Sequence, residues 1–255
     1  MRPAIVWAAV LALLFVATAG VAQEEDEQNK PTIPMKSRIE AGVTGTQGNS
    51  ETFDLRSYAE SVYKNDDTRL KIDGSYYYGS AEEKETGRDV ITRNEYNYGL
   101  INDWYFPEAP FSVFYSGRYS WDAFKEWTAR WTASVGLGYQ AIDEEDMYLT
   151  FRLGGGAVRE YGTDEDEVRP EGLAAIEYKW NPSEGQEFYF DTTYYHDFSG
   201  EGLHRILSKS YYSVKLDVLR GLAFNVGVDN EYQAEVAEDF EHNDLKYYSS
   251  LSVEF

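Results

Sequence analysis

The sequence predicts an all-β protein, an antiparallel up-and-down transmembrane β-barrel of about twelve strands. From Ser37 onward, apolar residues recur with a period of two, which places them on one face of each strand. Aromatic residues make up 16% of the chain and lie toward the strand ends, as in the aromatic girdles of a membrane barrel. The chain also ends on an aromatic residue, Phe255, which is typical of the closing strand of a bacterial outer-membrane barrel.

Two segments precede the predicted barrel. Residues 1–22 have the features of a secretory signal peptide, with a positive start, an apolar core and small residues before Gln23. A retained membrane anchor is the alternative, although the apolar core is short for a spanning helix. Residues 23–36 are acidic and contain two prolines, so we expect a flexible lead-in. The barrel domain then covers residues 37–255.

Composition excludes several classes of protein. With no cysteine, the chain forms no disulfide, has no thiol nucleophile and offers no thiolate to a metal. A net charge of −22 argues against nucleic-acid binding, which needs a basic surface. After the predicted signal peptide there is no apolar run of about 18 residues, which excludes a helical membrane protein.

The period-two pattern divides into segments that are each close to the length of a tilted membrane strand. The clearest alternation lies in 111–122 and in 127–141, where Trp131 is near one end and Tyr139 is at the other. An even number of strands places both barrel ends on one side, which we expect to be the periplasmic side. The predicted strands are 37–47, 51–64, 68–79, 90–103, 111–122, 127–141, 147–161, 170–181, 186–198, 209–218, 222–235 and 244–255.

The connections between these strands are expected to alternate in length, with the short turns facing the periplasm. The tight turns are 65–67, 143–146, 181–185 and 219–221. The longer loops are 80–89, 162–169, 199–208 and 236–243.

The face opposite the apolar residues is polar and carries charges of both signs. Such side chains can pair across strands, and within a backbone radius of roughly 12 Å they fill much of the space. We therefore expect a narrow or occluded interior. The candidate pore-lining residues are Arg38, Glu40, Arg56, Arg69, Asp73, Arg93, Glu95, Arg118, Arg130, Arg152, Asp191, Asp229 and Glu231. Other polar residues on this face include Lys71, Glu177 and Lys246.

Most of the excess negative charge lies in short acidic segments, which predict a solvated loop surface. The alternative is divalent-cation binding beside an anionic outer leaflet. The segment at 164–167 lacks the spaced ligands and central glycine of an EF-hand loop, so any such site is weak. We predict no dedicated metal site and no cofactor. The acidic segments are 24–27, 82–85, 143–146, 164–167 and 238–241.

His196 is the first of three histidines near strand ends or in loops on the predicted outer side. It adjoins Asp197, but neighbours along a strand face opposite sides of the sheet and cannot form a dyad with each other. His196 also shares the apolar-facing parity with Tyr194 and Phe198. We therefore expect an aromatic-like role at the membrane interface for this side chain.

The other histidines keep an outer-membrane hydrolase as an alternative, although no nucleophile motif accompanies them. The pairs to consider are His204 with Ser199 or Ser208, and His242 with Asp239. Three glycines at 154–156 do not form a phosphate loop, because they lie inside a predicted strand and no Lys-Ser/Thr follows. We predict no catalytic residue.

The last predicted strand carries a candidate insertion signal. It consists of Tyr247, Leu251, Val253 and Phe255, which share one face of the strand. We expect Phe255 to face outward and this strand to pair with 37–47, which closes the barrel and removes its edges.

The first predicted hairpin resembles a known family. Residues 40–52 combine a glycine-rich strand, a Gly48-Asn49-Ser50 turn and a second strand that begins near Thr52. With the tyrosine-rich strands and the terminal Phe255, this pattern resembles the salt-induced outer-membrane proteins, a domain of unknown function called DUF481 (the YdiY-like proteins). The resemblance implies a β-barrel in the bacterial outer membrane and a link to salt or osmotic conditions. It implies no catalytic residues.

These observations predict a non-enzymatic, monomeric outer-membrane barrel that stabilises the envelope. A narrow channel for ions or small solutes is the first alternative, a hydrolase is the second, and a soluble exported β-sandwich is a further one. The expected partners are outer-membrane lipids and the barrel assembly machinery, with divalent cations at the acidic loops as an option.

Overall fold

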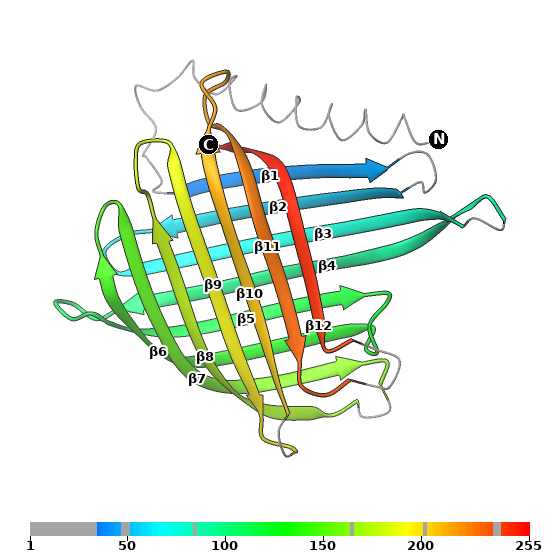
Figure 1. Ribbon diagram of the computed structural model, residues 1–255. Helices are drawn as coiled ribbons and strands as arrows, with labels where there is room; N and C mark the ends of the chain where they lie inside the picture. Colours follow the sequence, from blue (N-terminus) through cyan, green and yellow to red (C-terminus); the bar gives the residue numbers. More distant parts are fainter. Residues whose placement is uncertain (1–34, 47–51, 84–85, 164–165, 201–202, 237–240) are drawn as a thin grey trace.

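The computed structural model describes residues 35–46, 52–83, 86–163, 166–200, 203–236 and 241–255. Within these ranges twelve antiparallel strands follow one another around a barrel, and β12 returns to β1 to close it (Figure 1). The predicted fold class is confirmed. The strands are β1 (Met35–Thr46), β2 (Thr52–Lys64), β3 (Thr68–Glu83), β4 (Arg88–Tyr105), β5 (Phe111–Asp122), β6 (Ala129–Asp143), β7 (Met147–Tyr161), β8 (Val168–Trp180), β9 (Gln186–Asp197), β10 (His204–Lys215), β11 (Leu222–Gln233) and β12 (Asn243–Glu254).

The segments before the barrel are described only in part. The predicted signal peptide at 1–22 and most of the lead-in at 23–36 lie outside the described residues. β1 begins at Met35, two residues before the predicted start of the barrel domain. In the described part of the chain, no helix is long and apolar enough to cross a bilayer.

Side chains alternate between the two faces of the barrel wall, and β6 shows this pattern clearly. On its outer face Trp131, Val135 and Leu137 are 56%, 59% and 61% exposed. On its inner face Arg130 and Thr132 are buried. The wall is therefore apolar outside and polar inside, which reverses the usual arrangement of a protein that faces water.

The two ends of the barrel carry different sets of connections. One end, which we call the terminal end, carries the first residue of β1, the last residue of β12 and five turns. The opposite end, the loop end, carries the remaining connections, of which 234–242 is the longest. Gly185 has a φ of 86° in its turn, a conformation that strains residues with a Cβ. The terminal-end turns are 65–67, 106–110, 144–146, 181–185 and 216–221.

The β3–β4 hairpin is longer than predicted, and the long loop expected at 80–89 is wrong. β3 continues to Glu83 and β4 begins at Arg88. Ala81 pairs with Val90 and Glu83 pairs with Arg88, so a β-branched residue and a pair of opposite charges extend the ladder. The hairpin projects from the loop end in Figure 1.

β10 begins and ends earlier than the predicted strand at 209–218. The shift has a physical reason in the side chains near its start. Leu207 faces the lumen, where it packs against buried apolar residues. Ser208 faces outward and its hydroxyl lies 2.9 Å from that of Thr192. These two positions reverse the order that prevails in the other strands, in which apolar residues face outward and polar residues face inward. The start of β10 is therefore not recognisable from the sequence pattern.

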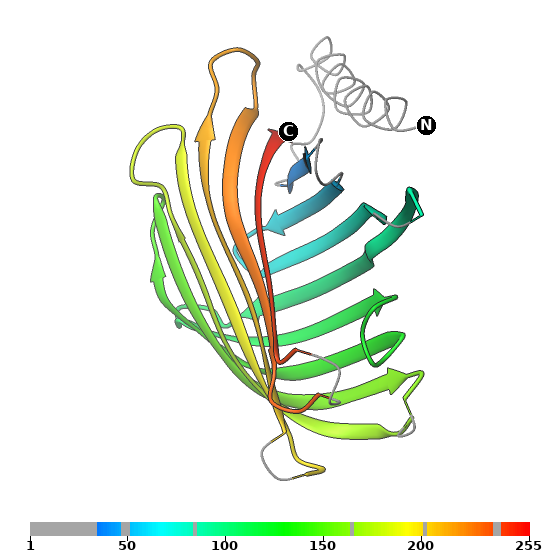
Figure 2. The ribbon, with the colours of Figure 1, turned by 45° about the vertical axis from the view of Figure 1, so that its right-hand side comes forward.

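The ladder that closes the barrel is short. β1 pairs with β12 from Arg38, opposite Glu254, to Ala41, opposite Leu251. Every other pair of neighbouring strands is matched over ten or more residues. Beyond these pairs β1 and β12 diverge toward the loop end (Figures 1 and 2). The predicted closing pair is present, but it covers only part of the height of the wall.

Gly154 and Gly156 let β7 approach β6 closely. A Cβ on Gly156 would overlap the carbonyl oxygen of Ala133, and a Cβ on Gly154 would lie 2.5 Å from that of Val135. These two glycines therefore relieve crowding at the inner face of the wall.

Candidate functional site

The structure places all thirteen candidate pore-lining side chains on the inner face of the barrel. Arg38 reaches from β1 toward Glu187 on β9, with 3.6 Å between the charged atoms. Arg93 lines a cavity near the junction of β1 and β12. The six that are buried are Glu40, Arg56, Arg69, Glu95, Arg130 and Arg152. The five that line a central cavity and are not buried are Asp73, Arg118, Asp191, Asp229 and Glu231.

Glu177 of β8 gathers three cations in the half of the lumen near the terminal end. Arg69 of β3 donates to both of its carboxylate oxygens, at 2.8 and 3.1 Å. Arg152 donates at 3.0 Å and Lys71 at 3.5 Å. Because β3 and β8 are five strands apart in the barrel, these bonds cross the lumen. Two hydroxyls add bonds of 2.9 and 3.2 Å, those of Tyr148 and Tyr189.

Asp103 of β4 holds the same cluster from the other side. Its carboxylate accepts two bonds from Arg152, at 2.9 and 2.8 Å, in the bidentate geometry that a guanidinium favours. It also lies 3.8 Å from Arg69, while Lys71 lies 3.4 Å from Glu60. Three cations thus face three carboxylates, which compensates charges that would otherwise be costly to bury. We call this group, with Glu177, the terminal-end cluster.

An apolar group inside the lumen lies beside this cluster, which sequence reasoning missed. The ring of Phe114 is fully buried and packs with Leu173 and Tyr195. Ile101 and Leu207 pack against the group from β4 and β10. Apolar side chains from strands on different sides of the barrel therefore fill part of the interior.

Ion pairs also cross the lumen nearer the loop end. Arg130 of β6 hydrogen-bonds Glu160 at 2.5 Å and Glu231 at 2.9 Å. Glu231 lies on β11, five strands from β6. Lys246 of β12 donates to Glu95 of β4 at 2.5 Å. Both halves of the lumen are thus bridged by charged side chains from opposite walls.

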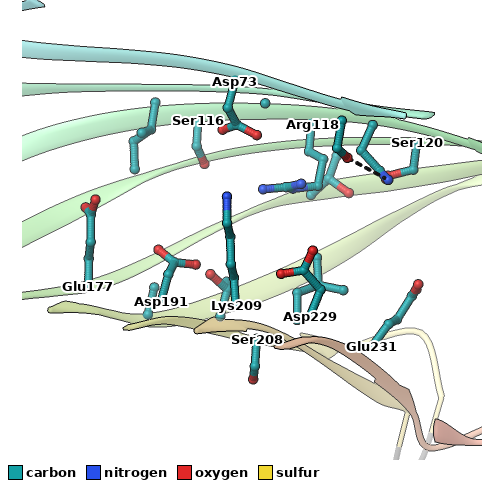
Figure 3. A pocket seen from close by; sticks show the side chains of 18 of the residues that line it. Asp73, Ser116, Arg118, Ser120, Glu177, Asp191, Ser208, Lys209, Asp229 and Glu231 are labelled. Carbon is teal, nitrogen blue, oxygen red and sulfur yellow. Dashed lines mark hydrogen bonds between the residues drawn. The ribbon is translucent and has the colours of Figure 1, made fainter. Parts of the chain in front are cut away.

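A cavity of about 200 Å³ lies in the middle of the lumen, and five basic side chains and six carboxylates line it. In Figure 3, Lys209 extends from β10 with Asp191 and Asp229 on either side, while Arg118 and Asp73 project from the facing wall. The Lys209 ammonium lies 3.3 Å from the centroid of the Tyr58 ring. Within the described residues, four charged lining side chains make no ion pair and no side-chain hydrogen bond, namely Asp73, Arg118, Asp191 and Lys209.

The three histidines lie in a row of aromatic rings on the outer face at the loop end. The His196 ring nitrogen Nδ1 lies 3.4 Å from the Tyr194 hydroxyl. The ring centroid of His204 is 5.6 Å from that of Tyr194 and 5.8 Å from that of Tyr232. The His242 ring stacks on Tyr232 at 6.3 Å. This arrangement fits side chains that sit among interfacial aromatic residues.

The structure separates one of the proposed hydrolase pairs. His204 and Ser208 are four residues apart on β10, which separates them by roughly 13 Å. The hydroxyl of Ser199 donates to Asp197 at 2.5 Å. Asp239, proposed as a partner of His242, lies outside the described residues. The hydrolase hypothesis stays a prediction.

The acidic segments fall partly outside the described residues, including 24–27 and 238–240. Of those described, Asp143 pairs with Lys64 and Asp166 pairs with Arg159, each at 2.8 Å and with both partners well exposed. The described part of the chain holds no group of three or more His, Asp or Glu side chains arranged for a metal ion. Divalent-cation binding at these loops remains a prediction.

The terminal strand places the four residues of its candidate insertion signal on the outer face. Tyr247, Leu251 and Phe255 are 83%, 40% and 55% exposed. Val253 shares their face but is only 6% exposed, and it pairs with Ile39 of β1 inside the short closing ladder.

A closed antiparallel barrel with an apolar outer face and a charged interior defines the class of this protein. It is an outer-membrane-type β-barrel, the architecture of channels and porins. The chain belongs to the family described as protein of unknown function, DUF481, whose model matches residues 39–255. The family resemblance noted in the sequence is confirmed.

Among solved structures the chain is similar to an outer membrane channel from Pseudomonas putida F1, with 8% identity and a TM-score of 0.47. That match covers 91% of this chain and 99% of the channel. It is also similar to the NanC porin, with 9% identity and a TM-score of 0.48, over 86% of this chain and 97% of the porin. At these TM-scores the likeness carries no inference about what this chain does. No curated protein matches the sequence.

Proposed function

We propose that this protein is a non-enzymatic structural barrel of the bacterial outer membrane whose lumen is closed. The observation that carries the proposal is the set of bonds by which Glu177 joins β8 to β3 across the lumen. The packing around Phe114 and the ion pair between Arg130 and Glu231 support it further. A barrel tied across its diameter in this way resists deformation and leaves little free path for a solute.

The outer face supports the membrane location. Its exposed side chains are large and apolar or aromatic, and Leu153 near the middle of β7 is 70% exposed. Such a surface is favourable in lipid and unfavourable in water. We infer that the terminal end faces the periplasm, that lipids and the assembly machinery are the partners, and that the barrel is monomeric.

A link to salt or osmotic conditions is part of the proposal through the family resemblance. The buried ion pairs give it a physical basis, since salt screens buried charges much less than exposed ones. The terminal-end cluster, where Glu177 and Asp103 are 2% and 1% exposed, therefore keeps the lumen closed as the ionic strength changes.

A liposome-swelling assay tests the closed lumen. The purified protein is reconstituted in liposomes, which are diluted into an isosmotic solution of glycine or arabinose. We expect no swelling beyond that of empty liposomes. Swelling that rises with the amount of folded protein would contradict the proposal and favour a channel.

A narrow channel is the second candidate, and the central cavity favours it. Asp73, Arg118, Asp191 and Lys209 offer charges of both signs that form no ion pair and no side-chain hydrogen bond within the described residues. In a channel, Arg118→Gln and Asp73→Asn would shift the ion selectivity in opposite directions. In a closed barrel, neither change creates a selective current.

A further inference from the structure

The closing seam between β1 and β12 opens toward the loop end. In the described residues the two strands are joined by four register pairs and by two backbone hydrogen bonds between Ser37 and Phe255, and the ladder does not continue past Ala41 and Leu251 toward the loop end. In both views β12 then turns away from β1 (Figures 1 and 2). Unpaired strand edges are costly in hydrocarbon, so an opening of this kind calls for a polar occupant.

A cavity of about 320 Å³ fills this opening, and we call it the seam cavity. Gly42 lines it from β1, and residues of β2, β3 and β4 line its other side. Both faces of β12 contribute to it, since Lys246 and Tyr248 belong to the inner face and Leu245 and Tyr247 to the outer face. The cavity is therefore bordered by residues of the inner face and of the outer face at this part of the wall.

The inner side of the seam cavity carries hydrogen-bond donors that lack acceptors. Arg56 is ion-paired with Glu40. Its buried Nη2 lies 3.6 Å from a carboxylate oxygen of Asp229, which is too far for a hydrogen bond, and this nitrogen has no hydrogen-bond partner. The hydroxyl of Tyr248 is also buried without a partner, and its ring centroid lies 3.6 Å from the Arg56 guanidinium carbon. Arg93 makes no ion pair or hydrogen bond with any described residue. Donors that are left unpaired in this way favour an oxygen-bearing anion.

The charge of the lining agrees with an anion. Arg56, Arg93 and Lys246 line the seam cavity, and Asp54 is the one carboxylate among its lining residues. Lys246 is already bonded to Glu95 and Arg56 is ion-paired with Glu40, which leaves Arg93 as the unpaired basic side chain and the main anchor within the described residues. A guanidinium presents several N–H groups in one plane and suits carboxylate and phosphate oxygens.

The outer side of the seam cavity is apolar. Leu245 and Tyr247 are 53% and 83% exposed on the lipid-facing side of β12. The volume is at the lower end of the range for ligand cavities, so it accommodates a headgroup and not a whole lipid. A ligand with a charged head and a hydrocarbon tail matches both sides of the wall at once.

We propose that the seam cavity binds the anionic headgroup of an amphiphile, a carboxylate or a phosphate, through Arg56, Arg93 and Tyr248. The hydrocarbon chain leaves the barrel between β1 and β12, over Leu245 and Tyr247. This site rests on the membrane placement proposed above, because the tail needs lipid or detergent outside the wall.

Titration calorimetry on the full chain, folded in a nonionic detergent, tests the site. The probes are dodecanoate, acetate as the same headgroup without a tail, and dodecyltrimethylammonium as a tail of opposite charge. We expect saturable binding of dodecanoate, roughly tenfold weaker binding in Arg93→Gln, and no change in Arg159→Gln, whose side chain is 43% exposed elsewhere. Equal binding of dodecyltrimethylammonium, or no loss in Arg93→Gln, would overturn the proposal.

A reversible crosslink separates a lipid source from a free anion. Val43 and Ser249 follow the last ladder pair by two places on each strand, and the chain has no native cysteine. In Val43→Cys/Ser249→Cys, we expect oxidation to abolish dodecanoate binding and reduction to restore it. If acetate binds as well as dodecanoate and the crosslink changes neither, the ligand is a free anion and the lateral path is wrong. Heat-modifiable migration on gels reports folding separately, so failure of the barrel is distinguished from failure of the site.

Discussion

Replacing Glu177 by glutamine tests how much the ion pairs across the lumen stabilise the barrel. The change keeps the size of the side chain and one carbonyl acceptor, so its effect is electrostatic and not a loss of packing. Glu177 is 2% exposed and faces Arg69, Lys71 and Arg152. Removing one partner of a buried ion pair costs about 3–5 kcal/mol, because the remaining charge is left uncompensated.

We expect the loss in the free energy of unfolding to lie at the lower end of that range, because other carboxylates still compensate the three cations. After the change, Arg152 keeps its two bonds to Asp103, and Lys71 keeps Glu60 at 3.4 Å. We therefore expect Glu177→Gln to lower the free energy of unfolding by about 3 kcal/mol. Urea unfolding in lipid vesicles, followed by tryptophan fluorescence, measures this loss.

The matched control is Asp166→Asn, which makes the same chemical change in a pair whose two side chains are both 43% exposed. It should lower the free energy of unfolding by no more than about 1 kcal/mol, because solvent screens an exposed pair. If Glu177→Gln is no more destabilising than Asp166→Asn, the cross-lumen bonds do not hold the barrel and the reasoning is refuted.

Three further changes test the interior, the wall and the outer face. Phe114→Ala removes a fully buried ring, so it should lower the free energy of unfolding by about 3–5 kcal/mol and raise the conductance in planar bilayers. An unchanged conductance would contradict the inference that this ring helps to close the lumen. Gly156→Ala should abolish the heat-modifiable folded band, because its Cβ would overlap the Ala133 carbonyl; normal folding would show that β6 and β7 are further apart. Leu153→Arg should lower the stability in vesicles by about 2–4 kcal/mol, and a neutral result would argue that this face does not meet lipid.

The fold could be predicted because the barrel wall obeys one rule along most of its length. On β6, Trp131, Val135 and Leu137 face outward and polar residues face inward, so the period of two is visible in the sequence. The rule fails on β10, where Leu207 faces the lumen and Ser208 faces outward. Tertiary packing determines which way these two side chains face, and the alternation of apolar and polar residues does not indicate that packing.

The hydrogen bonds and ion pairs across the lumen could not be predicted from the sequence, for a different reason. Parity places Arg69 and Glu177 on the inner face, but it does not say which inner residues lie at the same height on walls five strands apart. That depends on the register and tilt of every strand between them. Phe114 could have been noticed as an aromatic residue on the polar parity of β5, which is the signal of an apolar group inside the barrel.

Single-channel recording of the unaltered protein in planar bilayers tests the central claim most directly. The terminal-end cluster, the packing around Phe114 and the bridge from Arg130 to Glu231 predict a barrel that inserts and carries no steady current. Reproducible conductance steps from folded, inserted protein would contradict a closed lumen and would identify the barrel as a channel.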